Sequence, residues 1–329
     1  MLGMTFALLL AAEAPATVEI TEWQVPWEQS RPRDPYVAGP DEVWFVGQQA
    51  HYAAILTPST GDMKRIDLPD NAGPHNIIVD DRGAWYAGNK AAHIGFIDPD
   101  DYSITKHMLP GDGRRDVHTM EFTSDGDIWF TAQGANQVGH FDAQTETIKL
   151  WDVPTNRARP YGLIVHNDLP WLTLFGTNKL ATITANGELK EIQLPRDNNR
   201  PRRIGITSDG NLWYVDYVGG FVGRYNPETE MIDEWRAPAE ARSMPYAMAV
   251  DDHDYVWFAE TGVQPNRLVG FNTKTLEFTQ PFEVESGGGT IRHMVFDKAS
   301  QSLWFGTDAN TVGRAKINHG EAVSSNQAP

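Results

Sequence analysis

Residues 117–153 read VHTMEFTSDGDIWFTAQGANQVGHFDAQTETIKLWDV, and this stretch decides the fold. Four short runs alternate apolar and polar residues, at 117–122, 127–131, 137–141 and 147–153. Turn-forming residues lie between the first two runs, as Ser124-Asp125-Gly126, and between the last two, as Asp142-Ala143-Gln144. Alternation with a period of two indicates β-strands, and Gly, Asp and Ser between the runs indicate tight turns. The stretch therefore predicts a unit of four short strands.

This four-stranded unit recurs along the whole chain. Each copy contains an apolar residue followed by Trp and then an aromatic residue or Leu, and the Trp residues are 41 to 47 positions apart, at Trp44, Trp85, Trp129, Trp171, Trp213, Trp257 and Trp304. No helical pattern of usable length interrupts the series. Such units, about 40 to 45 residues long with one Trp each, are typical of propeller blades. We therefore predict an all-β, seven-bladed β-propeller whose Trp residues pack the blades together.

The two ends of the chain complement each other. The seventh unit stops after its third strand, near 311–317, whereas Glu19–Val25 before Pro26 matches the fourth strand of other units. We predict that this N-terminal strand completes the last blade and leaves no free sheet edge there. We therefore expect a signal peptide or disordered leader at 1–16, a single propeller at 17–318 and a disordered tail at 319–329.

The leader contains an apolar run of signal-peptide length that ends near Ala12-Glu13-Ala14. It predicts export to the periplasm or outside the cell, and a cytoplasmic location is the alternative if no export occurs. No later segment approaches the roughly 18 apolar residues that a membrane helix needs. We expect no membrane insertion by the mature chain.

Charge and composition exclude several classes of function. The formal net charge is -17, from 44 acidic and 27 basic residues, and a surface that binds nucleic acid needs the opposite sign. The chain has no Cys, which excludes a disulfide framework, a thiolate metal site and a Cys nucleophile. We expect a monomer that binds a small molecule or a cyclic peptide and no nucleic acid.

The first strand of each propeller blade lines the central channel, and the residues that begin these strands meet at one mouth. In chain order they are Tyr36, His75, His118, Tyr161, Arg202, Tyr246 and, in the seventh blade, Arg292 or His293. His can exchange a proton near neutral pH, and clustered Arg favours a carboxylate or a phosphate on a ligand. The alternative is that these side chains pair among themselves and with carboxylates such as Asp34, Asp116, Asp216 and Glu260.

Several motifs resemble the streptogramin B lyase (virginiamycin B lyase) family, over essentially all of 19–317. They are Asp125-Gly-Asp-Ile-Trp-Phe-Thr131, Asn136-Gln-Val-Gly139, Pro160-Tyr-Gly-Leu163 and Ser208-Asp-Gly-Asn-Leu-Trp213. The resemblance implies a Mg²⁺-assisted elimination that opens a cyclic depsipeptide at its ester bond without water. It also implies a catalytic His, a second His on the neighbouring blade, and two metal-holding carboxylates, all on blades six and seven.

This sequence departs from the family at that place. Arg292 stands where the catalytic His is expected, Thr290 replaces the carboxylate two residues earlier, and only Asp308 remains of the two carboxylates. His293 is displaced by one residue, which turns a β side chain to the other face. The family site is therefore not expected in its usual blades.

A closer match to the implied set lies on blades two and three. Asp116-Val-His118 reproduces the carboxylate two residues before a His, His75 supplies the neighbouring His, and Gln133 follows Trp129 by four residues. We therefore predict His118 and His75 as catalytic residues, and Asp116 and Gln133 as ligands of Mg²⁺, although an amide is a poorer ligand than a carboxylate.

A ligand at this mouth is expected to touch a wider set of residues, namely Tyr36, Tyr161, Arg202, Tyr246, Arg292, His293 and Glu260. The function predicted from these residues is an elimination that opens an ester or a cyclic depsipeptide. Two alternatives remain: a noncatalytic exported propeller that binds a ligand or serves as a scaffold, because fold alone does not determine function, and a lactone hydrolase-like propeller. The second would use a calcium site, for which Asp216, Glu260, Asp308 and Asn89 are available.

Overall fold

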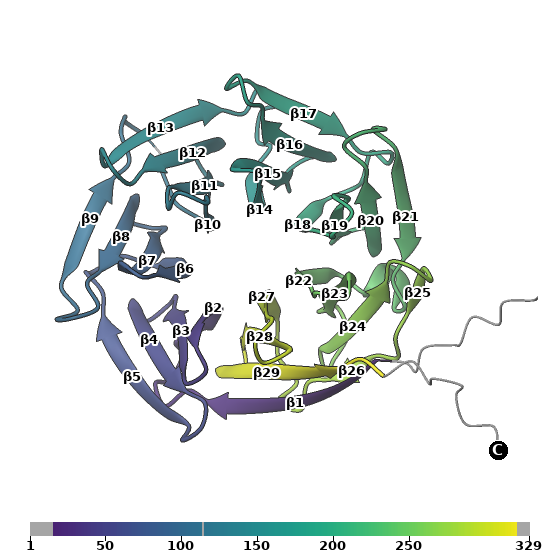
Figure 1. Ribbon diagram of the computed structural model, residues 1–329, viewed down its shortest axis with the longest axis horizontal. Coiled ribbons are helices and arrows are strands. Elements are labelled where there is room, and N and C mark those ends of the chain that lie inside the picture. The colour runs from purple at the N-terminus through teal and green to yellow at the C-terminus, as the bar shows by residue number, and fades with distance from the viewer. Residues whose placement is uncertain (1–15, 114, 321–329) are drawn as a thin grey trace, which may run out of the picture.

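Seven antiparallel sheets are arranged like blades around a central channel in the computed structural model, which describes residues 16–113 and 115–320 (Figure 1). This confirms the predicted all-β seven-bladed propeller of four-stranded blades. The predicted leader, apart from Ala16, and the predicted tail, apart from its first two residues, lie outside the described residues. No helix among the described residues is long and apolar enough to cross a membrane.

Each blade is a meander whose first strand lies at the channel and whose last strand lies at the rim (Figure 1). The strands of blades one to three are β2 (Pro32–Gly39), β3 (Glu42–Gly47), β4 (Tyr52–Thr57), β5 (Asp62–Asp67); β6 (Pro74–Asp80), β7 (Gly83–Gly88), β8 (His93–Ile97), β9 (Ile104–Met108); β10 (Met120–Phe122), β11 (Ile128–Ala132), β12 (Gln137–Asp142) and β13 (Thr147–Asp152). Those of blades four and five are β14 (Pro160–His166), β15 (Leu169–Leu174), β16 (Lys179–Ile183), β17 (Leu189–Gln193); β18 (Pro201–Ile206), β19 (Leu212–Asp216), β20 (Phe221–Tyr225) and β21 (Ile232–Arg236).

The last two blades depart slightly from this plan. In blade six the outer strand is split in two, and both halves pair with the third strand. The strands are β22 (Pro245–Val250), β23 (Tyr255–Glu260), β24 (Arg267–Asn272), β25 (Glu277–Phe278) and β26 (Phe282–Glu283), preceded by a single 3₁₀ turn, η1 (Glu240–Arg242). Blade seven contains β27 (Ile291–Asp297), β28 (Ser302–Thr307) and β29 (Thr311–Asn318).

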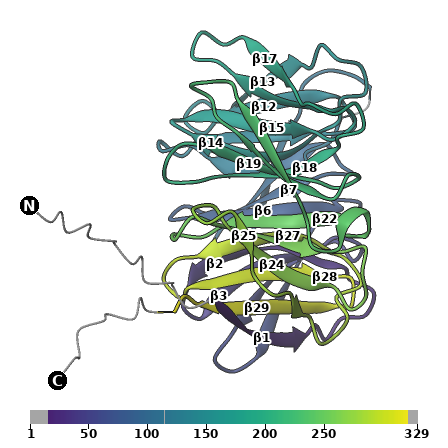
Figure 2. The same cartoon turned by 90° about the vertical axis from the view of Figure 1, so that its right-hand side faces the viewer.

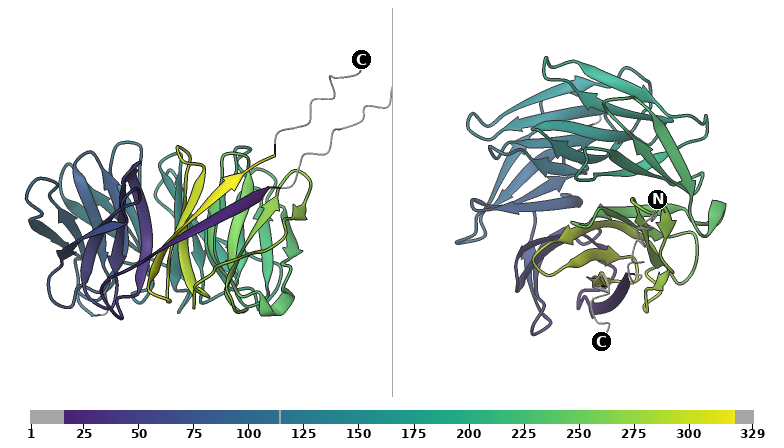
Figure 3. Two further views of the ribbon diagram at one scale, coloured as in Figure 1. Left: turned by 90° about the horizontal axis from the view of Figure 1, so that it is seen from below. Right: turned by 45° about the vertical axis from the view of Figure 1, so that its right-hand side comes forward.

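The fourth strand of blade seven comes from the other end of the chain. Strand β1 (Thr17–Gln24) runs antiparallel to β29, in a register that pairs Thr17 with Asn318 and Gln24 with Thr311. Figure 3 shows the two strands side by side, and the side view in Figure 2 places them at the edge of the ring. The outer edge of β29 is thereby paired over its whole length, so that it offers no free backbone groups to another chain.

The recurring Trp and Gly residues form the packing between blades. Six of the seven repeated Trp residues are buried, and clusters of apolar side chains join each blade to the next. A small residue on the third strand lies against an aromatic ring of the second strand: a Cβ atom on Gly139 would overlap the ring of Phe130. The same relation holds between Gly223 and Tyr214. Glycine at this position therefore lets a large ring fill the space within the blade.

A bulge near the start of the inner strands aims residues at the channel. Pro74 pairs with Gly88, but the next pair in register is Ile77 with Tyr86, so two residues of β6 face one residue of β7. The same irregularity follows the first residue of β14, β22 and β27, whereas in β18 the single residue Arg202 lies between two consecutive pairs without an opposite residue. Bulges re-aim side chains. The residue after the first one in each of these strands therefore leaves the regular alternation.

Candidate functional site: the axial ring

Strand register defines which residues are equivalent around the channel. Six of the seven inner strands begin opposite the same position of the second strand, as in Pro32 with Gly47 and Pro245 with Glu260. In blade three, where β10 begins later, the backbone amide of His118 donates to the carbonyl of Thr131 on the second strand. The next residue in each blade forms what we term the axial ring, which consists of Arg33, His75, His118, Tyr161, Arg202, Tyr246 and Arg292.

The expected position of Tyr36 in this ring was wrong. Pro35-Tyr36 has the same Pro-aromatic pattern as other blades, but Pro32 is the residue that pairs with Gly47, so Arg33 is the ring residue of blade one. Tyr36 pairs with Trp44, as Ile78 pairs with Trp85, and therefore lies deeper along its strand. Blade one thus adds a further arginine to the ring.

A buried charge network joins blades one, three, five and seven behind the ring. Asp34 Oδ1 accepts a hydrogen bond from Arg33 Nε at 3.0 Å, and Asp34 Oδ2 lies 3.8 Å from Arg203 Nη2. Arg203 also donates to Thr119 Oγ1 and to the backbone carbonyl of Arg292. Burial opposes ionisation of Asp34, but electrostatic interactions with Arg33, His293 and Arg203 outweigh it and hold the pKa of that carboxyl below its usual value.

The two histidines expected to be catalytic do meet in the channel. The rings of His75 and His118 lie with their centroids 3.6 Å apart, and His118 also packs on Tyr161 at 4.1 Å. Both are buried. Burial, together with nearby guanidinium groups of Arg33 and Arg203, lowers the pKa of both imidazoles well below the usual value. They are therefore neutral at pH 7 and form a packed layer that supports Tyr161.

Arginine and tyrosine side chains from blades four, five and six fill the mouth of the channel. The hydroxyls of Tyr161 and Tyr246 share a short hydrogen bond, and the guanidinium of Arg202 lies 3.6 Å from the ring centroid of Tyr246. Arg202 also stacks on Phe175 and Tyr217, at 4.4 and 4.2 Å. Such cation–π contacts hold the guanidinium over the aromatic rings.

This arrangement makes Tyr246 unusually acidic. Burial by itself opposes ionisation of its hydroxyl, but the charges of Arg202, Arg33 and Arg203 outweigh burial and lower the pKa of Tyr246 to about 8. The hydrogen bond from Tyr161 favours the same form, and the pKa of Tyr161 is raised by burial and by its neighbour. Tyr246 can therefore serve as a proton acceptor at mildly alkaline pH.

Arg292 is the axial-ring residue of blade seven, and its guanidinium pairs with the carboxylate of Asp308. Its Nη2 lies 2.5 Å from Asp308 Oδ2 and its Nε donates to Asp308 Oδ1, a bidentate pair, and Arg31 lies 3.5 Å from the same carboxylate. The guanidinium also lies 5.7 Å from the ring centroid of Tyr246. Two guanidinium groups thus flank the acidic tyrosine.

The residues expected to bind Mg²⁺ do not fit a metal. The two oxygens of Asp116 accept hydrogen bonds from the backbone amides of Gly134 and Ala135, all at 2.9 Å, so this carboxylate shapes the loop that carries Gln133. At the seventh blade, Arg292 takes the place of a cation beside Asp308. Mg²⁺ needs anionic oxygens that are free to coordinate it. At both positions the carboxylate already has partners, which are the loop amides at Asp116 and the guanidinium of Arg292 at Asp308.

The carboxylates proposed for a calcium site have structural partners as well. Glu260 is fully buried, pairs with Arg267 at 2.6 Å and accepts the backbone amide of Ala239, so it cannot contact a ligand as expected. Asp216 is held by Arg196, and the amide of Asn89 donates to a backbone carbonyl. These residues stabilise the loops after the second strands, because buried charges need partners.

A cavity lies deeper in the channel and is lined by residues that the sequence did not indicate as a group. Its volume is about 250 Å³, and Tyr36, Asn76, Glu121 and His293 line it together. The bulge of β27 separates His293, which faces this cavity, from Arg292 at the mouth. Burial raises the pKa of Glu121 to about 7 and, with weaker contributions from the arginines, lowers that of His293 to about 3. The period-2 pattern of β10 could have identified Glu121 as a channel residue.

The fold and the ring define a seven-bladed propeller with a polar, arginine-rich axial site. The sequence profile of the Virginiamycin B lyase family matches residues 12–170 and 168–315, and the chain belongs to this family. A virginiamycin B lyase of Nocardia farcinica (strain IFM 10152) is 26% identical over 222 residues, which are 66% of this chain and 74% of that protein.

Solved structures agree over almost the whole chain. A streptogramin B lyase structure, with 25% identity, superimposes with a TM-score of 0.82 and covers 92% of this chain and 98% of its own. A catalytically inactive virginiamycin B lyase from Staphylococcus aureus, solved with quinupristin, has 21% identity and a TM-score of 0.82, covering 91% and 99%. The second likeness is one of fold.

Proposed function

We propose that this chain is a lyase that opens a cyclic depsipeptide of the streptogramin B type at its ester bond, with Tyr246 as the base and arginines in place of a metal. The main support for this proposal is the position of Tyr246 between the guanidinium groups of Arg202 and Arg292. The pKa of Tyr246 is lowered to about 8. These three side chains belong to blades five, six and seven, and the last two are the blades on which the family resemblance places its catalytic set.

The chemistry requires a base and a positive charge. The Tyr246 phenolate takes a proton from the carbon next to a carbonyl, a carbon–carbon double bond forms, and the carbon–oxygen bond of the ester breaks to release a carboxylate. No water is consumed. Negative charge develops on the carbonyl oxygen during proton removal, and fixed cationic donors beside it lower the barrier. Arg202, whose Nε has no hydrogen-bond partner among the described residues, can donate to that oxygen.

The charge balance of the mouth supports this role. Five guanidinium groups meet two carboxylates, because Arg33 and Arg203 share Asp34, Arg31 and Arg292 share Asp308, and the guanidinium of Arg202 lies among aromatic rings. The neighbouring histidines are neutral. An excess of buried positive charge is costly unless an anion offsets it. A phenolate, a substrate carboxylate or the developing enolate meets that need.

A second candidate is a noncatalytic propeller that binds such a ligand. The observation that favours it is the burial of Tyr246, which is 2% exposed and lies beneath Arg202. A substrate reaches the hydroxyl only if Arg202 leaves its stacked position. If Arg202 stays in place, the ligand rests on Arg202, Tyr217 and Phe175, and no proton is transferred.

The test compares two buried tyrosines. Tyr246→Phe removes the hydroxyl of the proposed base, whereas Tyr225→Phe removes a buried hydroxyl in β20, away from the mouth. With virginiamycin B as the probe, the account expects Tyr246→Phe to lower turnover by about 10²- to 10⁴-fold, as the loss of a general base does, and Tyr225→Phe to turn over like the wild type. Binding of the probe by the wild type without any product would support the noncatalytic candidate instead.

A further inference from the structure

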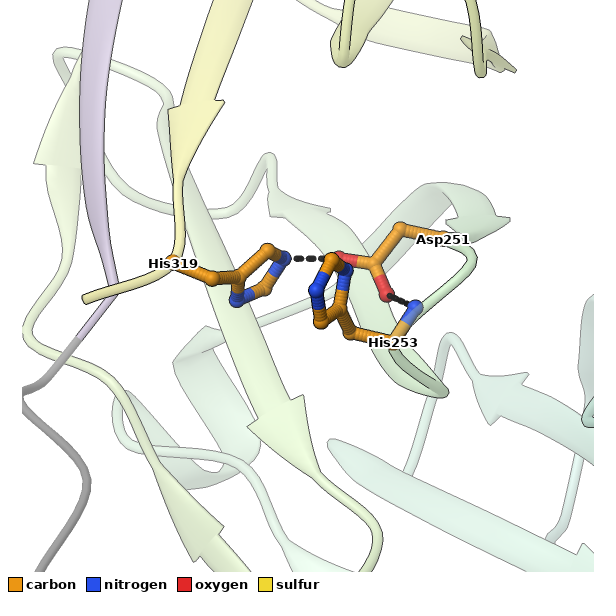
Figure 4. Close-up of side chains that lie close together, drawn as sticks. All are labelled: Asp251, His253 and His319. Carbon is orange, nitrogen blue, oxygen red and sulfur yellow. Dashed lines mark hydrogen bonds and ion pairs between the residues drawn. The ribbon is translucent and has the colours of Figure 1, made fainter. Parts of the chain in front are cut away.

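Two histidines and an aspartate meet outside the channel, where the end of the chain passes blade six. Asp251 and His253 lie in the turn between β22 and β23, and His319 directly follows β29. One potential ligand atom from each residue lies within 4.8 Å of the other two, and no other group of three such residues is this close among the described ones. Figure 4 shows the ring of His319 approaching the turn from the strand end.

Asp251 is held rigidly in this cluster. Its Oδ1 accepts hydrogen bonds from the backbone amides of His253 and Tyr255, and its Oδ2 accepts the indole N–H of Trp257 at 2.7 Å. The same Oδ2 lies 2.8 Å from Nε2 of His319. One carboxylate oxygen therefore remains directed at a histidine nitrogen. This differs from Asp116, whose oxygens accept hydrogen bonds from the backbone amides of Gly134 and Ala135.

The second histidine is also oriented toward this point. The rings of His253 and His319 stack with centroids 4.1 Å apart, and Asp252 Oδ1 lies 3.2 Å from Nδ1 of His253. Histidines that bind metals usually have such a carboxylate behind the ring, which fixes its orientation. His253 and His319 also line an open surface cleft, so that solvent can reach the cluster.

We propose that Asp251, His253 and His319 bind one divalent transition-metal ion, with Zn²⁺ as the best match. Two imidazole nitrogens and a carboxylate oxygen are donors that Zn²⁺ accepts, and the open side leaves its fourth position to water. Bonds of about 2.0–2.1 Å at a tetrahedral angle separate the donors by roughly 3.3 Å. The distance between Asp251 Oδ2 and His319 Nε2, now 2.8 Å, must therefore increase by only about 0.5 Å. The proton shared by these two atoms is released when the metal binds.

Bound metal would fasten the end of β29 to the turn of blade six. This position lies at the seam where the first and last strands of the chain pair in blade seven. A ligand that binds only the folded form raises the unfolding temperature. The site is therefore inferred to stabilise ring closure, independently of the chemistry at the channel mouth.

The experiment measures Zn²⁺ binding to the full chain, produced without a polyhistidine tag and stripped with a chelator, by equilibrium dialysis near neutral pH. His253→Gln and His319→Gln remove one ligand each, and His166→Gln, at the corresponding end of β14, serves as the control. Circular dichroism checks that each variant is folded. Co²⁺ binding adds a second readout, because tetrahedral Co²⁺ absorbs strongly in visible light.

The account expects one Zn²⁺ per chain in the wild type and the control, and affinity at least about tenfold weaker in both ligand variants. It also expects Zn²⁺ to raise the unfolding temperature of the wild type and the control, and that rise to be lost in the two ligand variants. The proposal is overturned if the wild type retains no Zn²⁺, or if folded His253→Gln and His319→Gln bind Zn²⁺ as tightly as the wild type.

Discussion

Asp34 provides a sharp test of how the axial ring is held together. Its side chain is fully buried and lies between two buried arginines, at 3.0 Å from Arg33 and 3.8 Å from Arg203. Asp34→Asn keeps the size and shape of the side chain but removes its charge. Two guanidinium groups then remain in the channel without the carboxylate that they share.

The expected cost follows from burial. Removing one partner of a buried ion pair destabilises a protein by about 3–5 kcal/mol, because the remaining charge stays unpaired. The amide oxygen of Asn can still accept one hydrogen bond, so we expect the lower end, about 3 kcal/mol. Asp67→Asn is the control: its pair with Arg65 is shorter, at 2.6 Å, but Asp67 is 78% exposed. Exposed pairs contribute at most about 1 kcal/mol.

The assay is urea unfolding followed by Trp fluorescence and circular dichroism. A cost for Asp34→Asn below about 1 kcal/mol, or one equal to that of Asp67→Asn, would refute the reasoning, since burial would then not decide the effect. The pH dependence provides a second check. The folded pKa of Asp34 is lowered from 3.8, so its contribution is complete above that value and is lost as the pH falls below it. Asp34→Asn should lack this acid-sensitive contribution.

Three further results follow from the structure. If Tyr246 is the base, turnover of virginiamycin B rises as the pH passes the Tyr246 pKa of about 8 and then levels off; a profile that is flat from pH 7 to 9 would exclude this role. The pKa of Glu121 is raised from 4.5 to about 7, so its burial destabilises the fold increasingly as the pH rises through this range. Glu121→Gln should therefore stabilise the protein by up to about 3 kcal/mol at pH 8 and change its stability little at pH 4. Urea unfolding at both pH values measures the difference. Gly139→Ala pushes a Cβ into Phe130 and should cost about 1–3 kcal/mol in thermal unfolding, whereas Gly39→Ala, with its nearest neighbour at 3.9 Å, should stay within about 0.5 kcal/mol.

The architecture could be predicted from the sequence because each blade repeats the same local signals. A Trp on the second strand, a small residue on the third and turn residues between them recur about every 42 residues, a spacing typical of blades. These signals depend on neighbours within one blade, such as Gly139 against Phe130. A fold built from repeats of local structure can therefore be predicted from the sequence without knowledge of long-range contacts.

The site was harder to predict, because its geometry depends on register and on contacts between blades. Pro32-Arg33 and Pro35-Tyr36 are equally plausible starts for the first inner strand, and only the pairing of Pro32 with Gly47 selects Arg33. The bulge of β27, which directs the neighbouring side chains of Arg292 and His293 to different places, also has no clear signal in the sequence. A shift of one residue reverses the side of the strand on which a side chain lies.

The chemical role of a residue depends equally on its partners. Asp116 two residues before His118 matches the metal-binding pattern that the family resemblance implies, yet its oxygens are taken by amides of the loop at Gly134 and Ala135. From the sequence, Tyr246 is expected only as one of several residues that contact a ligand. Its acidity comes from Arg33, Arg202 and Arg203 on two other blades, which no local pattern reveals.

The central claim is elimination at an arginine-lined mouth without a metal. The most direct measurement is the mass of the product formed from virginiamycin B by the chelator-treated chain at about pH 8. We expect a linear product whose mass equals that of the cyclic substrate, because elimination consumes no water. We expect the same rate with or without chelator, because arginines take the place of a metal in the proposed reaction. An unopened ring, a product heavier by one water molecule, or turnover that needs added Mg²⁺ would contradict it.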